Sequence, residues 1–476
     1  MLLDREELFR IDRSPRRHHA RCLRAWTWHE QISRKSLLAL HVVPVRSRFI
    51  WLTACGKRWT TFPGTAINSL IADEIFSTHS AHRMAESGKY SAKLIVMTVD
   101  RRRFLVLTAA ATLAPSALAT AARTHASRAG GHMLQMNGYA VDAETPLELL
   151  TDYLTPNELF FVRSHWIPRT PDPKTWRLMI DGDVENPTTF SLADLRALRV
   201  TEVTCVLQCA GNGRGLYTPT VPGVQWRFGA TGNARWRGVR VRDVLERVHV
   251  KGTALHLHAF GTDDPPESVP PFHRSIEMSK AMDDAILAWE MNGQPLPAVH
   301  GAPLRLVVPG WAGDHWMKWL VRLSARSEPA KGFYMDTAYR YPNSPGAPGV
   351  AFKPEEMTPV TDLFVKSNIT TAPKSARVGK AVMIAGFAFS GAPDISKVEV
   401  SDDDGATWHD ATLDPRHDPY AWRLWSLDWT PSKPGRTTIV ARATDSRGSV
   451  QPREAVWNQS GYFFNSWQAV EVEVKA

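Results

Sequence analysis

The C-terminal part of the chain alternates apolar and polar residues in short runs, a period of two that strands satisfy and helices do not. The runs are ARVGKAVMIAGFAFS, SKVEVSDDDGATWHDATL, AWRLWSLDWT, GRTTIVARATDSRGS and WQAVEVEV. Turn residues separate them, and Asp404-Gly405 is a favoured hairpin turn. We therefore predict an all-β, immunoglobulin-like sandwich over residues 358–476. This segment contains no cysteine, so its core has to rest on the packing of residues such as Trp408, Trp422 and Trp425.

The preceding residues, 127–345, mix two kinds of pattern. β-rich runs lie at 160–163, 176–182, 254–260 and 304–310. Between them, residues 191–198 begin with a serine that can cap a helix, and residues 239–248 have the apolar spacing of a helix on a core. No GxGxxG follows a strand, which argues against a nucleotide-binding βαβ unit. The stretch 341–356 is rich in Pro and Gly, as is typical of a boundary between domains. We therefore predict an α+β chain in which a mixed α/β domain precedes the sandwich.

Charge is distributed unevenly along the chain. The net charge is +9, yet residues 1–119 hold 19 Lys and Arg against 9 Asp and Glu, and the remainder holds 38 against 39. Because the bulk of the protein is neutral, no basic domain is available to neutralise phosphates, which excludes nucleic acid as a partner. The four cysteines are too few for a disulfide scaffold.

Residues 97–126 have the features of an export signal. Arg101 and Arg102 precede an apolar run, Phe104–Leu118, which ends in the small-residue pattern Ala117–Ala119. The paired arginines resemble the twin-arginine signal and predict a periplasmic protein. A buried helix or a membrane anchor is the alternative. The run is shorter than the ~20 residues that a span requires, and no later stretch reaches that length, so we expect no membrane span.

Residues 1–96 precede this signal, although a signal belongs at a terminus. Met97 lies four residues before Arg101. We therefore expect translation to begin at Met97 and residues 1–96 to be a non-native extension. A real but disordered N-terminal extension is the alternative, and N-terminal sequencing of the unprocessed protein distinguishes the two.

Two cysteines lie beyond the signal. Cys209 stands beside Gly and Asn directly after an apolar strand, which leaves its thiol on a loop, and nearby arginines favour the thiolate that binds metals. Cys205 lies within the apolar run and is expected in the core. A two-thiolate zinc pair would need a further Cys or His set with zinc-like spacing, and none follows. The pattern CxxCH is absent, so we expect no covalent haem.

Several motifs occur in an order that resembles the sulfite oxidase family of molybdenum enzymes. They are QCAGN (208–212), NARWRGVRVRDVL (233–245), WEMNGQPLP (289–297), VPGWAGDHWMKWL (308–320) and AWRLW (421–425). The resemblance runs from about Leu159 to the C-terminus. It implies a mixed α+β domain that binds molybdopterin and an immunoglobulin-like domain through which two copies form a homodimer. Both patterns described above agree with that organisation.

The resemblance also implies how a molybdenum–molybdopterin cofactor is held. Cys209 corresponds to the protein's thiolate ligand to molybdenum, a role that suits a soft ligand. The family's FFVRNH appears here as FFVRSH. The residues that match cofactor contacts are Phe161, Val162, Ser164, His165, Asp263, His300, Arg305, Trp316, Met317 and Lys318. Arg305 and Lys318 can neutralise a phosphate, and Asp263 can accept from pterin N–H groups.

The substrate pocket follows from the same resemblance. Sulfite is a small dianion, so fixed cations should lie beside the metal. Arg163 and Arg214 match the family's active-site arginines, and Tyr339 matches its catalytic tyrosine. Trp226 matches an aromatic residue of the pocket wall. The family commonly carries another arginine near its C-terminal WN-x-x-G, where this chain has Trp457-Asn458-Gln459-Ser460-Gly461.

The function implied is the oxidation of sulfite to sulfate in the periplasm. No haem segment is recognisable, so electrons should pass to an external c-type cytochrome. The missing C-terminal arginine leaves a second function open, that of a related molybdenum enzyme acting on another sulfur species, such as a sulfane dehydrogenase-like subunit of thiosulfate oxidation. A non-catalytic binding protein built on a sandwich is the more distant alternative.

Overall fold

The computed structural model describes residues 133–135, 142–166, 170–262 and 269–476, together with the backbone of three strands near the N-terminus. The chain divides into two units, Met1–Ala117 and Leu118–Ala476. In the first, β1 (Leu38–Val45), β2 (Arg48–Cys55) and β3 (Arg58–Thr60) form an antiparallel sheet. The predicted export signal over 97–126, and residues 1–96 apart from these strands, lie outside the described residues. No helix in the described part of the chain has the length and apolar character needed to cross a membrane.

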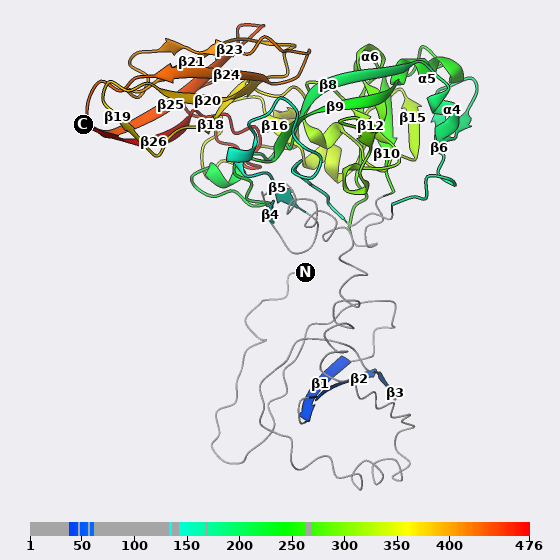
Figure 1. Ribbon diagram of the computed structural model, residues 1–476. Helices are drawn as coiled ribbons and strands as arrows, with labels where there is room; N and C mark the ends of the chain where they lie inside the picture. The colour runs from blue at the N-terminus through cyan, green and yellow to red at the C-terminus, as the bar shows by residue number, and fades with distance from the viewer. Residues whose placement is uncertain are drawn as a thin grey trace. The chain divides into compact units, whose positions relative to one another are not determined.

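The first domain of the second unit contains two five-stranded sheets (Figure 1). One has the order β11-β10-β15-β6-β7, from His273–Glu277, His256–Phe260, Arg322–Arg326, Leu178–Gly182 and Thr188–Phe190. The other runs β13-β12-β9-β8, from Gln294–Pro295, Ile286–Met291, Thr231–Arg240 and Val200–Gln208, with β14 (Arg305–Val307) also on β12. Short helices α4 (Leu192–Arg196), α5 (Val241–Val248) and α6 (Met278–Asp283) join them. The mixed domain predicted from the sequence is therefore present.

Local sequence explains where the helices begin. Ser191 caps α4, its hydroxyl accepting from the Asp194 N–H at 3.2 Å while the Asp194 carboxylate accepts from the Ser191 N–H at 2.8 Å. The other predicted helix begins two residues later than expected, because its first residues complete β9. Residues 160–163 form no strand and contribute only an isolated bridge between Val162 and Ala143. The burial of Phe160 and Phe161 in the core, rather than a ladder, holds that segment.

The C-terminal domain is a sandwich of two antiparallel-rich sheets, as its period of two predicts. One sheet has the order β18-β20-β24-β23, from Lys366–Thr371, Val382–Phe389, Arg423–Trp429 and Thr412–Leu413. The other runs β19-β26-β25-β21-β22, from Ser375–Arg377, Gln468–Lys475, Gly435–Asp445, Ile395–Ser401 and His409–Asp410. Asp404 and Gly405 have φ of 60° and 88° between the paired strands β21 and β22, which confirms the predicted turn.

The three tryptophans expected in the sandwich core have different places. Trp425 is in that core. Trp408 is half-buried and instead lies edge-on against Trp467, with Arg442 stacked 4.0 Å over its ring. Trp422 is fully buried, but in a third cluster that joins the two domains. It lies just before β24 and packs with residues of the first domain, which takes it out of the sandwich interior.

This third cluster, the interdomain cluster, combines aromatic residues from both domains. Among its members are Tyr339, Phe387, Trp422 and Tyr462. A backbone hydrogen bond from Val206 on β8 to the Tyr420 carbonyl also crosses between the domains at 2.9 Å. The two domains, green-yellow and orange-red in Figure 1, therefore pack on each other through a continuous apolar contact.

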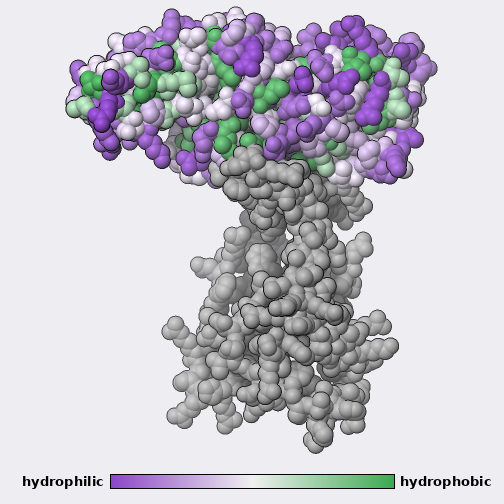
Figure 2. Space-filling model, in the orientation of Figure 1, coloured by the Kyte–Doolittle hydropathy of each residue, from purple (hydrophilic) through white to green (hydrophobic). Residues whose placement is uncertain are grey.

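The boundary segment 341–356 is tied back to its neighbours. β16 (Arg340–Pro342) pairs with β17 (Met357–Pro359) on either side of it, and β4 (Leu134–Gln135) pairs with β5 (Ala143–Glu144) at the start of the unit. Short helical turns are η2 (Leu147–Leu149), η3 (Arg214–Leu216), η4 (Ala298–His300), η5 (Gly313–His315), η6 (Phe333–Thr337) and η7 (Pro354–Glu356). On the described part of the face in Figure 2, apolar residues form small groups between hydrophilic ones.

Candidate active site

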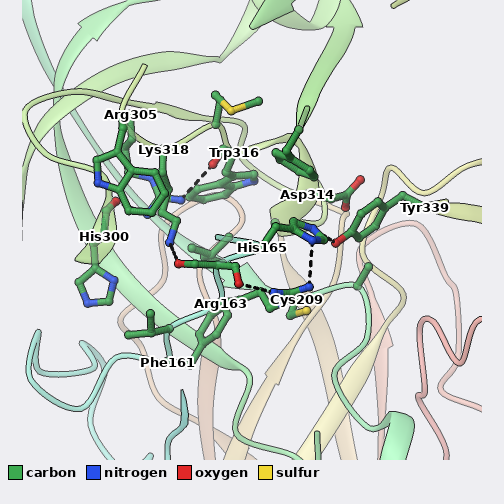
Figure 3. Close-up of a pocket in the computed structure, with 18 residues that line it drawn as sticks. Phe161, Arg163, His165, Cys209, His300, Arg305, Asp314, Trp316, Lys318 and Tyr339 are labelled. Carbon is green, nitrogen blue, oxygen red and sulfur yellow. Dashed lines mark hydrogen bonds between the residues drawn. The ribbon is translucent and has the colours of Figure 1, made fainter. Parts of the chain in front are cut away.

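A pocket in the first domain brings together all but three of the site residues predicted from the sequence (Figure 3). The predicted residues that line it are Phe161, Val162, Arg163, Ser164, His165, Cys209, His300, Arg305, Trp316, Met317, Lys318 and Tyr339. They come from segments far apart in the sequence. Figure 3 shows Cys209 and Tyr339 toward one end, with His300 and Arg305 toward the other.

A hydrogen-bonded turn after β8 fixes Cys209 at the pocket. Its N–H donates to the Ala230 carbonyl at 3.0 Å, and its own carbonyl accepts from the Asn212 N–H at 2.9 Å. The Asn212 side chain donates to the Gln208 side chain at 2.9 Å and accepts from the Ala230 N–H at 3.1 Å. The asparagine of QCAGN therefore locks the loop that carries the cysteine.

The two cysteines of this segment differ in surroundings. Burial raises the pKa of the Cys209 thiol, and the positive charges of Arg163 and Arg214 act in the opposite direction. Cys205 has no exposed surface and lies in the core of the domain, where burial raises the pKa of its thiol. The expectation that Cys205 is a core residue is confirmed, and only Cys209 reaches the pocket.

A row of hydrogen bonds links Arg163, His165 and Tyr339 beside the thiol. An Arg163 Nη lies 3.2 Å from His165 Nδ1, and His165 Nε2 lies 2.8 Å from the Tyr339 hydroxyl. Burial, aided by the charges of Arg163 and Lys318, holds the pKa of His165 well below its usual range, so the ring is neutral. Because guanidinium can only donate, Nδ1 accepts and Nε2 donates to the Tyr339 oxygen. The Tyr339 hydrogen is then directed elsewhere and is available to a ligand.

Tyr339 is held by the C-terminal domain. Its backbone has φ of 55°, a left-handed conformation that is unusual for a bulky residue. Its N–H donates to the Tyr462 hydroxyl at 3.3 Å, and the two rings stack at 5.4 Å. Residues of the interdomain cluster thus determine where the pocket's tyrosine points.

The opposite end of the pocket contains a buried cation. Arg305 lies between two indole rings, 4.8 Å from Trp236 and 5.6 Å from Trp316. It donates to the His300 carbonyl at 3.0 Å and the Trp316 carbonyl at 3.4 Å, while its buried Nε has no partner among the described residues. Burial lowers the pKa of Arg305 to about 9. No carboxylate of the described residues pairs with it, so this end of the pocket favours an anion.

Two neighbours complete this end. Lys318 donates to the Ser164 hydroxyl at 2.7 Å and to the Val299 carbonyl at 3.1 Å. His300 is buried, and burial together with the charges of Arg305 and Lys318 lowers its pKa to about 3. Neutral imidazole, ammonium, hydroxyl and guanidinium groups therefore face one region, a combination suited to phosphate oxygens.

Arg214 lies beside the pocket but does not line it. Its Nε donates to the Ser460 carbonyl at 2.9 Å and an Nη to the Val224 carbonyl at 3.2 Å. A Cβ on Gly461 would lie 2.7 Å from its side chain, so a glycine is needed for that close approach. In this chain the loop at 457–461, where an arginine is missing, supplies the Ser460 carbonyl that anchors Arg214.

Two further expectations have separate outcomes. Asp263, predicted to contact the pterin, lies outside the described residues. Trp226, predicted on the pocket wall, is instead fully buried in the core of the domain and absent from the pocket. That prediction was wrong because the indole packs into the interior behind the pocket.

Sequence reasoning missed other lining residues, of which Asp314 carries a charge. The others are Leu207, Ala210, Phe272, Gly313 and Trp319. Asp314 stands two residues before the predicted contact Trp316, within DHWMKWL. Its buried position raises the pKa of its carboxyl to about 7, with Arg274 acting in the opposite direction. A charged residue inside an apolar, recognised motif was the signal that could have found it.

We expect a pH dependence of stability from His315. Burial, then the charge of Arg274, holds the pKa of His315 well below its usual range, and Nε2 lies 2.7 Å from the Val360 carbonyl. A histidine with a lowered pKa contributes stability that is complete above ~6.5 and is lost as pH falls, by about 1.4 kcal/mol per pH unit. His315→Gln keeps an N–H donor without titrating. Calorimetry should show that the Tm of His315→Gln falls less than the Tm of the parent between pH 7.5 and pH 5.5.

An exposed histidine serves as the control for this prediction. His409→Gln on β22 should leave the parent's Tm difference between the two pH values unchanged. An equal loss of Tm in the parent and in His315→Gln would contradict the role of His315.

Comparison with known proteins agrees with this geometry. Residues 164–334 match a family described as the oxidoreductase molybdopterin binding domain, and residues 357–475 match the Mo-co oxidoreductase dimerisation domain. The chain is 34% identical over 361 residues to the sulfite oxidase of Arabidopsis thaliana, covering 69% of this chain and 91% of that one. The chain belongs to the sulfite oxidase family. It has the family's molybdopterin-binding domain and its dimerisation domain.

Other members of the sulfite oxidase family differ in length and in the activity their names give. Mitochondrial sulfite oxidase of Rattus norvegicus is 37% identical over 70% of this chain, which spans 64% of that enzyme's length. The crystal structure of the sulfane dehydrogenase SoxCD from Paracoccus pantotrophus superposes with a TM-score of 0.62 at 30% identity, covering 71% of this chain and 86% of that chain. Membership of the sulfite oxidase family therefore leaves the substrate open.

The pocket fits the cofactor that a molybdopterin-binding domain implies. Within the described residues no three His, Cys, Asp or Glu side chains converge on one point, and a molybdenum held by the cofactor's own sulfurs would need no such cage. A single thiol at the pocket lining, that of Cys209, would then suffice on the protein side. The unpartnered Nε of Arg305 is the stronger indication, because a buried guanidinium without a carboxylate requires an anion from elsewhere.

Proposed function

We propose that this sulfite oxidase family member oxidises sulfite to sulfate and passes the electrons one at a time to an external c-type cytochrome. The observation that carries the proposal is the row Arg163–His165–Tyr339 beside Cys209, which presents a cation and a hydroxyl hydrogen to a small oxyanion. The relatives at 34–38% identity named as sulfite oxidases support it. In the reaction, sulfite and water give sulfate, two protons and two electrons.

The residues divide into two groups in this proposal. Cys209 would ligate molybdenum, while Ser164, His300, Arg305 and Lys318 would hold the cofactor's phosphate. When bound, the cofactor supplies the two-electron redox change and the oxygen transfer. This chain's part is to bind the anion, orient it and limit the access of water.

Arg163 and Tyr339 would act on the substrate directly. The guanidinium of Arg163 is fixed by Asp142 at 3.3 Å and by the Ser164 carbonyl at 2.5 Å, so its position needs no reorganisation when an anion enters. The Tyr339 hydroxyl, receiving its hydrogen bond from His165, donates its own hydrogen to a substrate oxygen. A preorganised cation and donor stabilise charge on the oxyanion throughout the reaction.

Metal analysis combined with kinetics tests the proposed function. Purified protein should contain molybdenum and pterin and should reduce a c-type cytochrome in the presence of sulfite. Protein that carries the cofactor but leaves cytochrome unreduced with sulfite would overturn sulfite oxidation. Properly matured protein that lacks molybdenum and pterin would overturn its assignment as an enzyme and favour a non-catalytic binding protein.

Oxidation of a protein-bound sulfane is the second candidate function. The superposition on the sulfane dehydrogenase SoxCD and the lack of an arginine at Gln459 and Ser460 both favour it. Gln459 contacts the Phe352 backbone rather than the pocket. A substrate panel with the same cytochrome distinguishes the candidates, since only a sulfane dehydrogenase would prefer the carrier-bound substrate over free sulfite.

We also propose that the protein is a periplasmic homodimer exported by the twin-arginine route. The dimerisation domain over 357–475 supports the dimer, and Arg101 and Arg102 before an apolar run support the route. Light scattering of purified protein measures the first. The double variant Arg101→Lys/Arg102→Lys should remain in the cytoplasm, which cell fractionation would show.

Tyr339→Phe should lower kcat/KM for sulfite. The substitution removes the donor but keeps the ring and its stacking on Tyr462. A lost hydrogen bond to a charged group costs about 1.5–3 kcal/mol, roughly ten- to a hundred-fold in kcat/KM. Tyr341→Phe, two residues on and outside the pocket, is the matched control and should leave the kinetics unchanged. Equal kinetics in the parent and Tyr339→Phe would exclude the hydroxyl from substrate binding.

A further inference from the structure

A buried ion pair lies at the wall of the pocket beside Tyr339. Arg274 on β11 and Asp314 in η5 are 2.7 Å apart between an Nη and Oδ2, and their side chains are 1% and 0% exposed. Asp314 lines the pocket, whereas Arg274 stands behind it. Figure 3 shows the Asp314 carboxylate next to the Tyr339 ring. A carboxyl group whose pKa burial raises to about 7, against the charge of Arg274, is thus placed at the end of the pocket that the proposed function assigns to an oxyanion.

Arg274 is fixed from several directions. It donates to the Tyr334 carbonyl, and its guanidinium lies 5.4 Å over the ring of Tyr339. The same Nη that reaches Asp314 lies 3.0 Å from Nε2 of His315, whose ring is neutral. The buried Nε of Arg274 has no hydrogen-bond partner among the described residues. Arg274 is therefore committed to this wall and to Asp314.

Asp314 depends on that single cation. Apart from Arg274, the titratable side chains near its carboxylate are His315, at 3.5 Å and neutral, and Tyr339 and Tyr462, whose pKa values burial raises and the charge of Asp314 raises further. Neither carboxylate oxygen has a further hydrogen-bond partner among the described residues. In a buried environment a like charge beside an anion site is strongly unfavourable, whereas a closely paired carboxylate exerts little net field.

We propose that the Arg274–Asp314 pair sets the charge of the pocket wall, and so determines how tightly the pocket holds a small anionic substrate. With both partners present the wall is neutral. Loss of Arg274 removes the cation that opposes the effect of burial on Asp314, so the carboxyl takes up a proton and the wall stays neutral, whereas loss of Asp314 adds the field of an uncompensated guanidinium. The pair acts on selectivity through charge; it takes no part in the transfer itself. The inference rests on the proposed anionic substrate.

Unequal effects of the two single variants on anion binding test this charge role. Inorganic sulfate is the probe, and its dissociation constant is measured on the molybdenum-loaded holoenzyme from the sulfate-dependent Tm and from inhibition of turnover. At pH 8, where Asp314 is ionised in the parent, Asp314→Asn should bind sulfate several-fold more tightly than the parent, whereas Arg274→Gln, whose Asp314 is protonated, should bind sulfate within about threefold of the parent. The double variant Arg274→Gln/Asp314→Asn should return to within about threefold of the parent, because its wall is neutral again.

A purely structural role gives a different pattern. Both single variants would then weaken sulfate binding, and the double variant would be no better than the worse of them; that outcome overturns the inference. If Arg274→Gln fails to mature, Arg274→Lys replaces it; this variant retains the charge and should bind sulfate like the parent. The direction in which Asp314→Asn changes sulfate affinity then decides between the charge role and a structural role. Weaker sulfate binding by Asp314→Asn would refute the proposal.

Turnover of the parent protein distinguishes failure of this inference from failure of the proposed function. Sulfite-dependent cytochrome reduction is recorded for the parent independently of sulfate binding. If the parent oxidises a different sulfur species and Asp314→Asn alone binds sulfate more tightly, the charge role of the pair holds and only the assignment of sulfite as substrate is lost. If the parent oxidises sulfite but every variant binds sulfate with the affinity of the parent, the proposed function stands and the inference about the pair is overturned.

Discussion

Cys209→Ser should abolish turnover while leaving the fold intact. A serine hydroxyl is a hard, weakly acidic group and replaces a soft thiolate poorly as a ligand to molybdenum. The turn that carries the residue is held by backbone bonds to Ala230 and Asn212, and these do not involve the side chain. We therefore expect folded protein with normal Tm and activity at background. Steady-state kinetics at known molybdenum content measures the loss.

Cys205 provides a matched control in the same segment. It is four residues away and fully buried, and it lies outside the pocket. Cys205→Ala should cost about 1 kcal/mol of packing energy and leave kcat unchanged. Equal losses of activity in the two variants, at equal molybdenum content, would contradict the assignment of one ligand and one core cysteine.

Motif order predicted most of the pocket because the motifs themselves are short and contiguous. Arg163, Ser164 and His165 come from one segment, and Trp316, Met317 and Lys318 from another, so local sequence matching places each group as a unit. The sandwich was equally accessible, since its strands alternate with a period of two and its turns carry Asp and Gly. Both successes depend on information that lies within a few residues of each position.

What the sequence could not provide are contacts fixed by tertiary packing. Arg274 and Asp314 are 40 residues apart, and their pairing depends on how η5 packs against β11. The place of Trp422 in the interdomain cluster depends likewise on how the two domains meet. Arg214 shows the same limit, because its anchor is a backbone carbonyl at Ser460, which no residue type encodes. Residue identity predicts chemistry, whereas these partners are decided by the fold.

The stacking of Tyr339 on Tyr462 indicates why the dimerisation domain matters to the site in the other domain. The tyrosine's left-handed backbone is held by a hydroxyl and a ring from beyond the boundary segment. A residue in such a conformation persists only where its surroundings over-determine it. The C-terminal domain therefore positions a pocket residue in addition to providing a surface for assembly.

Arg305→Met should lower cofactor content and at the same time stabilise the cofactor-free protein. The guanidinium is buried between Trp236 and Trp316 with an unpartnered Nε, and no carboxylate of the described residues offsets its charge. An uncompensated buried charge opposes folding, and replacing buried ionic groups with apolar ones often gains about 1–4 kcal/mol. The same charge becomes favourable when a phosphate pairs with it, and its removal should then cost about 2–5 kcal/mol of cofactor binding.

Opposite signs make this prediction specific. Molybdenum and pterin content of the purified variant should fall by more than tenfold, whereas urea unfolding of cofactor-free protein should show a higher midpoint than the parent. Arg322→Met provides the control, since that arginine is partly exposed on β15 and pairs with Asp181 outside the pocket. It should change neither quantity appreciably, because exposed ion pairs contribute little. Full cofactor content in Arg305→Met would show that this guanidinium does not bind the phosphate. A lower urea midpoint in Arg305→Met than in the parent would show that the contacts of Arg305 with the two indole rings outweigh the cost of burying its charge.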